Sequence, residues 1–174
     1  KTLADLGDPA TLDALISACN DDFWSVRAHA GCGIAKIGGP KAVEALVGLF
    51  NDSIMEVRDQ AVEATAKIGP IVLDRLVTAM KDERWRVREH AAKAAGKIKD
   101  SGTVDALIGA CRDRDGAVKS AAAEALGKIA DAKAIPALIK LFRDSSKIVR
   151  ETAGTALVYI GYPSVDPLIE SLTD

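Results

Sequence analysis

Apolar residues recur along the whole chain with the spacing of an amphipathic α-helix. Six blocks of four apolar residues follow offsets of three, one and three, and they begin at Leu12, Val43, Leu73, Val104, Ile135 and Val165. Such offsets place the four side chains of a block on one face of an α-helix. Prolines recur near the first turn of these segments, where a missing N–H group is tolerated, at Pro9, Pro40, Pro70 and Pro163. Each block therefore predicts the first helix of a repeated unit.

A second pattern lies between these blocks and is built on a valine followed by a basic residue. The valines are separated by 31, 30, 31 and 31 residues, at Val26, Val57, Val87, Val118 and Val149. An aspartate stands five residues before each valine, an alanine four residues after it and an isoleucine eleven residues after it. We predict a second helix from near the valine to the isoleucine, with C-terminal glycine caps at Gly38, Gly69 and Gly161. Aspartates precede the first helices as expected N-terminal caps, at Asp8, Asp100 and Asp131.

The fixed period predicts an all-α solenoid of about five and a half two-helix repeats in one domain, residues 1–174. The links are only a few residues long, so each pair forms an antiparallel hairpin. No pair can bury its apolar faces alone, and stacking of neighbouring pairs buries them. Residues 1–6 fit the tail of a preceding repeat and residues 163–174 the first helix of a last, partial repeat. We therefore expect a fragment of a longer array, or end-to-end self-association through the uncapped ends.

The amino-acid composition restricts the classes of partner that the chain is expected to bind. Hydrophobic residues make up 48% of the chain but aromatic residues only 4%, which suits closely packed helices. The formal net charge is −2, so there is no basic excess of the kind that binds nucleic acid or an anionic membrane. No apolar run approaches the ~18 residues of a membrane span, and no signal peptide is visible. Three cysteines without metal-type spacing favour a reducing cytoplasm.

The repeat resembles the short HEAT-like repeats first recognised in phycobilin lyases. The residues that carry the resemblance are Asn51-Asp52, Val57-Arg58, Ala61, Ala64 and Ile68-Gly69, and again Arg143-Asp144, Val149-Arg150, Ala153, Ala156-Leu157 and Ile160-Gly161. The resemblance covers essentially the whole chain and implies a right-handed α-solenoid whose second helices line the concave surface. Such repeats occur in scaffolds, adaptors, lyases and hydroxylases, so the resemblance specifies the fold more closely than the function.

The concave stripe is the first candidate for a binding site. It lies opposite the apolar face of the second helices and holds both tryptophans and both histidines of the chain. Tryptophan and arginine are enriched among residues that dominate protein interfaces. The candidate partner-binding residues are Trp24, His29, Cys32, Met55, Gln60, Glu63, Trp85, Arg86, Glu89, His90, Lys93 and Tyr159. The competing interpretation is that the tryptophans only cover the turns between helices.

Metal binding and thiol catalysis are weaker interpretations. Deoxyhypusine hydroxylases carry His-Glu pairs that hold two irons on HEAT-like repeats, whereas this chain has Ala28-His29 and Glu89-His90. We therefore expect solvated or partner-contacting histidines, no metal and no cofactor. Cys32 falls in an otherwise polar column and should be accessible, with His29 one helical turn away, but an incidental thiol is favoured over a nucleophile. The other two cysteines, Cys19 and Cys111, share a column with large apolar residues and should fill the core.

Two rows of basic residues could be mistaken for a phosphate track. The residues after the valines, from Arg27 to Arg150, are matched one for one by the aspartate row, so structural ion pairs are the favoured use. A row of lysines, Lys36, Lys67, Lys97 and Lys128, falls in the last turn of the second helices, where cations suit the helix dipole.

Taken together, the sequence predicts a cytoplasmic module that binds another protein or peptide on its concave face and is not an enzyme. The alternative is a lyase-type or chaperone subunit that acts on a cofactor-bearing protein.

Overall fold

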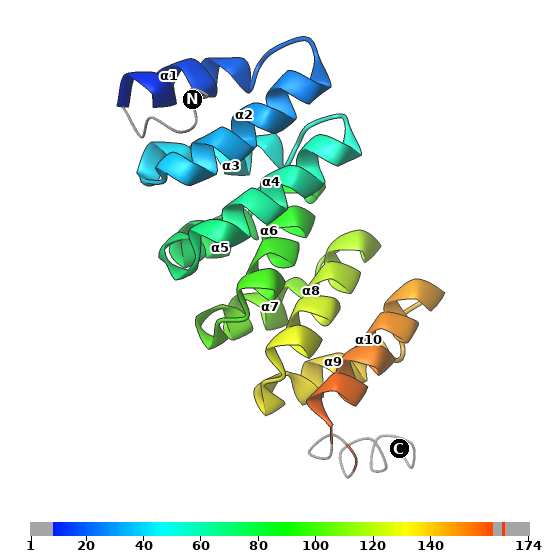
Figure 1. The fold of residues 1–174 in the computed structure, drawn as a ribbon. Helices are drawn as coiled ribbons and strands as arrows, with labels where there is room; N and C mark the ends of the chain where they lie inside the picture. Colours follow the sequence, from blue (N-terminus) through cyan, green and yellow to red (C-terminus); the bar gives the residue numbers. More distant parts are fainter. Residues whose placement is uncertain (1–8, 162–164, 166–174) are drawn as a thin grey trace.

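The computed structural model describes residues 9–161 and residue 165, and within these residues every regular element is helical (Figure 1). The first helices of the repeats, called A helices below, are α1 (Pro9–Ala18), α3 (Pro40–Leu49), α5 (Leu73–Ala79), α7 (Val104–Ala110) and α9 (Ile135–Leu141). The second helices, called B helices, are α2 (Trp24–Ile37), α4 (Met55–Ile68), α6 (Trp85–Ile98), α8 (Gly116–Ile129) and α10 (Lys147–Ile160). The predicted all-α solenoid is confirmed. The expected partial repeats at the two ends lie outside the described residues, except for Val165.

The B helices begin two residues before the predicted valine and end at the predicted isoleucine. Gly38, Gly69 and Gly161 follow three of them with φ values of 72°, 85° and 81°, so the predicted glycine caps are confirmed. The other two B helices are followed by Lys99 and Ala130, which adopt left-handed φ values of 58° and 60° without the freedom of glycine. The period therefore stays constant although the capping chemistry changes.

The third, fourth and fifth A helices are shorter than the apolar pattern predicts, because each is preceded by a 3₁₀ turn. These turns are η2 (Pro70–Val72), η3 (Ser101–Thr103) and η4 (Ala132–Ala134). The side chains of Asp100 and Asp131 accept hydrogen bonds from the backbone N–H groups of Gly102 and Lys133, at 2.8 and 2.9 Å. The two aspartates thus cap the 3₁₀ turns rather than an α-helix directly, and Asp8 lies outside the described residues.

The core runs between the two helical layers as a continuous column. Four of the five repeat valines are fully buried, together with the leucine of each neighbouring A helix, as in Val57 with Leu46 and Val87 with Leu76. Val26 differs and is 38% exposed, and its helix α2 is the first described B helix, so no described B helix precedes it in the stack. The predicted apolar columns thus supply the core, although some of their members, such as Leu73 and Ile108, are only half-buried.

The B helices of successive repeats pack against each other much more extensively than the A helices do. The B helices therefore lie on the inner side of the curved stack and the A helices on the outer side (Figure 1). The approach is closest in the second half: a Cβ atom on Gly96 would lie 2.7 Å from Ala125 Cα, and one on Gly127 would lie 2.7 Å from Ala156 Cα. Glycine at these two positions brings the backbones of α6, α8 and α10 into contact.

Candidate protein-binding surface

Three large apolar side chains stand in a row where successive B helices begin. Trp24, Met55 and Trp85 are the first residues of α2, α4 and α6 and are 47%, 61% and 38% exposed. The repeat places them in register, and we call these three residues the apolar row. The guanidinium carbon of Arg86 lies 5.0 Å from the centre of the Trp85 ring, within cation–π distance. Half-exposed tryptophans in register have both a packing contact and a free surface, which suits a docking site.

The next turns of α2 and α4 add polar groups to this surface. His29 is exposed, and its Nδ1 atom lies 2.6 Å from the carbonyl oxygen of Ser25. Cys32 is also exposed, as predicted, and its thiol lies 3.8 Å from Oε1 of the half-buried Gln60 across the α2–α4 interface. The structure thus brings together two of the predicted residues that lie 28 positions apart in the chain.

His90 does not belong to the surface, and the prediction of a solvated or partner-contacting histidine is wrong at this position. Its side chain is 2% exposed, with Nδ1 2.7 Å from the carbonyl oxygen of Arg86 and the ring 6.2 Å from the ring of Phe50. Burial lowers the pKa of His90, partly offset by the hydrogen bond to the Arg86 carbonyl and by the nearby Glu89 carboxylate. The reason is the preceding repeat, which covers this side of α6.

Grooves between the B helices hold three of the remaining predicted residues, Glu63, Lys93 and Tyr159. A groove of about 300 Å³ crosses α4, α6 and α8 and includes Glu63 and Lys93 in its lining. A second groove of about 670 Å³ lies between α8 and α10 and includes Tyr159, which is 68% exposed. Both grooves are lined by Glu124 and Lys128, so together they form one trough along the inner face. These last two residues were missed as site residues, although the period places them in the columns of Glu63 and Lys97.

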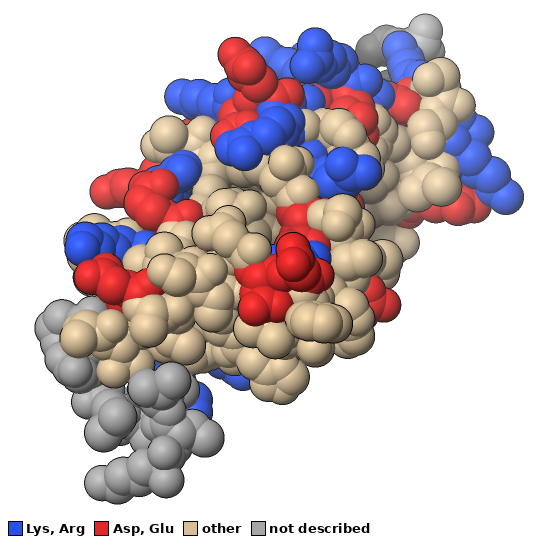
Figure 2. Space-filling model, turned by 90° about the horizontal axis from the view of Figure 1, so that it is seen from above, with Lys and Arg blue, Asp and Glu red and all other residues tan. Residues whose placement is uncertain are grey.

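Most of the charged side chains that line the trough already form ion pairs with neighbouring side chains. Lys97 Nζ lies 2.7 Å from Glu63, Lys128 Nζ 2.6 Å from Glu124, and Lys93 Nζ 2.6 Å from the half-buried Glu89. Viewed from above, the surface carries acidic and basic side chains of both signs around a broad uncharged area (Figure 2). A mixed surface of this kind suits a patterned polypeptide better than a uniformly charged polymer.

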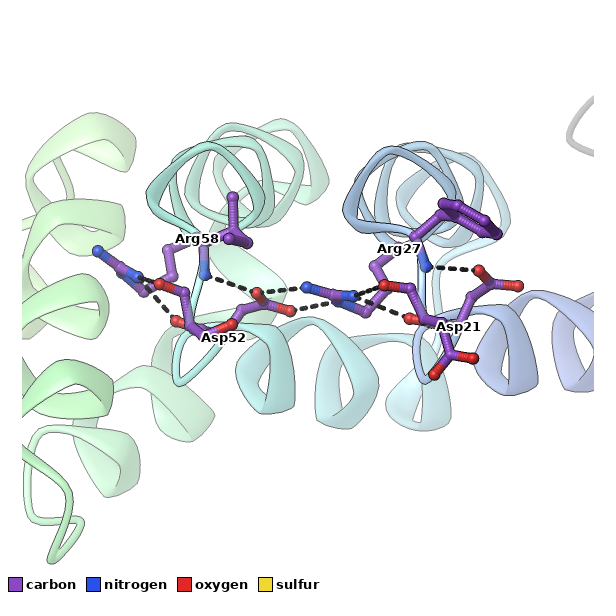
Figure 3. Close-up of polar contacts among 8 residues, drawn as sticks. Asp21, Arg27, Asp52 and Arg58 are labelled. Carbon is purple, nitrogen blue, oxygen red and sulfur yellow. Dashed lines mark hydrogen bonds and ion pairs between the residues drawn. The ribbon is translucent and has the colours of Figure 1, made fainter.

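The basic residues that follow the valines serve mainly as structural ion pairs between repeats. Arg27 donates two hydrogen bonds to Asp52 of the next repeat, from Nε at 2.6 Å and from Nη2 at 2.9 Å (Figure 3). Arg88 does the same with Asp113, at 2.6 and 2.8 Å, and Lys119 pairs with Asp144. The predicted ion pairing is confirmed at these three interfaces.

These pairs shift the acid–base equilibria of both partners. The Asp52 hydrogen bonds raise the pKa of Arg27. Burial opposes the ionisation of Asp52 and Asp113. The hydrogen bonds that each carboxylate accepts from its paired arginine and from a backbone N–H group act the other way, and the pKa of both aspartates is lowered. The hydrogen bond from Lys119 lowers the pKa of Asp144. All of these charged groups are therefore used in contacts between neighbouring repeats.

The thiols divide as predicted. Cys19 and Cys111 are buried, and burial raises their pKa values to about 11 and about 12, so both are poor nucleophiles. Over residues 9–161 and residue 165, no group of three or more His, Cys, Asp and Glu side chains could hold a metal ion. No helix in the same part of the chain has the length and the apolar character that a membrane crossing requires.

Comparison with known proteins agrees with this architecture. A family model for HEAT repeats matches residues 1–66, 55–125 and 104–174, which together span the chain. No curated protein sequence matches the chain.

Solved structures match the chain over most of its length. The CpcE–CpcF complex of phycocyanin lyase from Nostoc sp. PCC7120 is 23% identical with a TM-score of 0.61, and the match covers 94% of this chain and 70% of that one. An engineered protein is 24% identical with a TM-score of 0.57, over 93% of this chain and 85% of that one. A designed armadillo repeat protein in complex with the peptide (KR)4 is 24% identical with a TM-score of 0.51, over 91% and 85%. At these identities the likeness shows a shared fold.

Proposed function

The chain belongs to the HEAT repeat family, and we propose that it is a binding module that holds a partner protein or peptide along its inner, B-helix face. The observation that carries the proposal is the apolar row, Trp24, Met55 and Trp85. Exposed large apolar side chains are common singly, but three in register on adjacent repeats form a patch of the kind that proteins use for docking. Tryptophan is also the residue most enriched among those that dominate binding energy.

The inner face supplies the remaining requirements of a peptide site. The trough runs across α4, α6, α8 and α10, so it offers contacts over several repeats rather than one enclosed pocket. Its paired charges, such as Lys97 with Glu63, present both donors and acceptors to a polypeptide. An elongated partner segment fits this shape better than a small metabolite, which would need an enclosed and mostly apolar cavity.

Two neighbours in the structure comparison support the proposal by analogy. CpcE and CpcF of phycocyanin lyase were solved in complex with each other, and the designed armadillo protein was solved with a bound peptide. The solenoid fold thus accommodates protein and peptide partners in at least those two proteins. We further infer a reducing compartment such as the cytoplasm, because all three thiols are free.

The lyase-type alternative concerns a cofactor-bearing partner and would need a residue that acts on it. His29 and Cys32 are the exposed groups closest to that description, but no described base activates the thiol. Binding without catalysis therefore remains the proposed activity. An absorbance spectrum of the purified protein with a bound chromophore would favour the lyase-type role instead.

Selection from a library of random peptides tests the proposed function. Peptides selected on the wild-type protein should bind it and should lose about tenfold or more in affinity, 1.4 kcal/mol, when Trp85 or Met55 is replaced by Ala. Ile71→Ala is the matched control, since Ile71 is an 83% exposed apolar residue in η2, outside the B helices. Equal affinity of all three variants for every selected peptide would refute a site at the apolar row.

A further inference from the structure

The series of inter-repeat ion pairs is broken at one interface, between α4 and α6. Arg58 donates from Nη1 to the carbonyl oxygens of Asp52 and Ser53 at 2.7 and 3.0 Å, as the equivalent arginines do in their own turns. Its Nε atom, however, is buried without a hydrogen-bond partner, whereas Nε of Arg27 and of Arg88 each binds the aspartate of the next repeat. Figure 3 shows the series from Asp21 through Arg27 and Asp52 to Arg58, whose guanidinium group binds the backbone carbonyl oxygens of its own turn.

The expected partner of Arg58 is held by a different arginine. Asp82 accepts hydrogen bonds from the backbone N, Nε and Nη2 atoms of Arg84, at 2.9, 2.8 and 2.8 Å. The Arg84 hydrogen bond lowers the pKa of Asp82 to about 2. No other repeat has a basic residue at the position of Arg84, where Phe23, Ile54, Asp115 and Ser146 stand instead.

The length of the repeat changes at the same interface. Val57 and Val87 are separated by 30 residues, while every other step between repeat valines is 31. The missing residue lies in the turn after α4, where Gly69-Pro70 replaces the Gly38-Gly39-Pro40 of the preceding repeat. The shorter turn shifts the following aspartate one position closer along the chain to Arg58 than in the paired repeats. The geometry that aligns arginine and aspartate elsewhere is therefore altered at this interface.

Among the described residues, close glycine contacts between B helices occur only from α6 onward. Gly96 and Gly127 admit the close approach of α6 to α8 and of α8 to α10, whereas the corresponding residues of α2 and α4 are Ala35 and Ala66. The ion pair that crosses from α4 to α6 is Glu63–Lys97 at 2.7 Å, with side chains 56% and 38% exposed, and His90 of α6 packs on Phe50 at the end of α3. An exposed ion pair of this kind contributes little stability.

From the broken ion-pair series and the shorter turn we propose that the α4–α6 interface is a hinge, at which a block formed by α1–α4 bends relative to a block formed by α5–α10. The first block is joined by the Arg27–Asp52 pair. The second is joined by the Arg88–Asp113 and Lys119–Asp144 pairs and by the two glycine contacts. The 300 Å³ groove crosses the hinge from α4 to α8, so bending there alters its width. The hinge itself does not depend on the proposed function.

Distance distributions between nitroxide labels on the outer face test the hinge. Gly48 in α3 and Gly109 in α7 are exposed, two repeats apart and on opposite sides of the hinge. Thr78 in α5 and Lys140 in α9 occupy the same column, also exposed and two repeats apart, but both lie in the second block. The two labelled proteins, Gly48→Cys/Gly109→Cys and Thr78→Cys/Lys140→Cys, are made with the exposed thiol removed by Cys32→Ser.

The hinge predicts a broader distance distribution for the Gly48/Gly109 pair than for the Thr78/Lys140 pair in pulsed electron–electron double resonance. Distributions of equal width, or a narrower one across the hinge, would overturn the proposal. Lys119→Gln removes one ion pair within the second block and should broaden the Thr78/Lys140 distribution. An unchanged distribution would show that the ion pairs are not what stiffens the stack. Neither distance measurement tests peptide binding, so the hinge can be refuted without refuting the proposed function, and the reverse also holds.

Discussion

The close approach of the B helices makes Gly127→Ala the sharpest test of the packing. At an exposed helical position, replacement of Gly by Ala stabilises a protein by roughly 0.5–1 kcal/mol, because the unfolded chain loses freedom and the helix gains propensity. At Gly127 the added Cβ would lie 2.7 Å from Ala156 Cα and 3.0 Å from Ala156 Cβ. Carbon atoms prefer separations of about 3.5–4.0 Å, so α8 and α10 must move apart by several tenths of an ångström or more.

The magnitude follows from these opposing effects. Overpacking of a close interface costs about 1–3 kcal/mol, and the helix-propensity gain offsets at most about 1 kcal/mol of it. We therefore expect Gly127→Ala to lower the free energy of unfolding by about 1–2 kcal/mol, and Tm by roughly 2–8 °C. The measurements are urea unfolding followed by circular dichroism at 222 nm and a thermal scan of the same samples.

Gly109→Ala is the matched control, because Gly109 lies in α7 with no atom within 4 Å of an added Cβ. It should leave the free energy of unfolding unchanged or raise it by up to about 1 kcal/mol. If Gly127→Ala proved as stable as Gly109→Ala, α8 and α10 would not be in backbone contact, and the reasoning from the glycine column would be refuted.

Three further predictions concern charges and thiols. Asp113→Ala should lower the free energy of unfolding by about 3 kcal/mol in urea titrations, since it leaves the buried Arg88 guanidinium without its carboxylate; a loss below 0.5 kcal/mol would contradict this. Because burial lowers the pKa of His90, the unfolded chain takes up a proton near pH 6.5 while the folded chain resists it, so stability should fall as the pH drops from about 6.5, and His90→Gln should flatten this slope. In the native protein one thiol, Cys32, should react rapidly with Ellman's reagent, and three should react after unfolding; two fast thiols would show that a core column is open.

Much of the fold could be predicted from the sequence because one period carries it. Among the described residues, the repeat valines and isoleucines locate each B helix and the apolar blocks locate each A helix, since helical spacing and turn residues depend on neighbours within a few positions. The arginine–aspartate pairing could also be predicted, because it repeats once per period. The apolar row was found from the same columns, and Trp24, Met55 and Trp85 are exposed as that pattern requires.

What the sequence could not decide is how each repeat meets the next. His29 and His90 occupy one column, yet His29 is exposed and His90 is buried, because α3 and α4 cover the second and no described repeat covers the first. Arg58 matches Arg27 in sequence, yet its Nε atom has no partner, because a turn one residue shorter and a competing Arg84 change the interface. Local periodicity determines which residues face inward within a repeat. The contacts between repeats depend on backbone separation and on competition among several side chains, and only the tertiary structure brings those together.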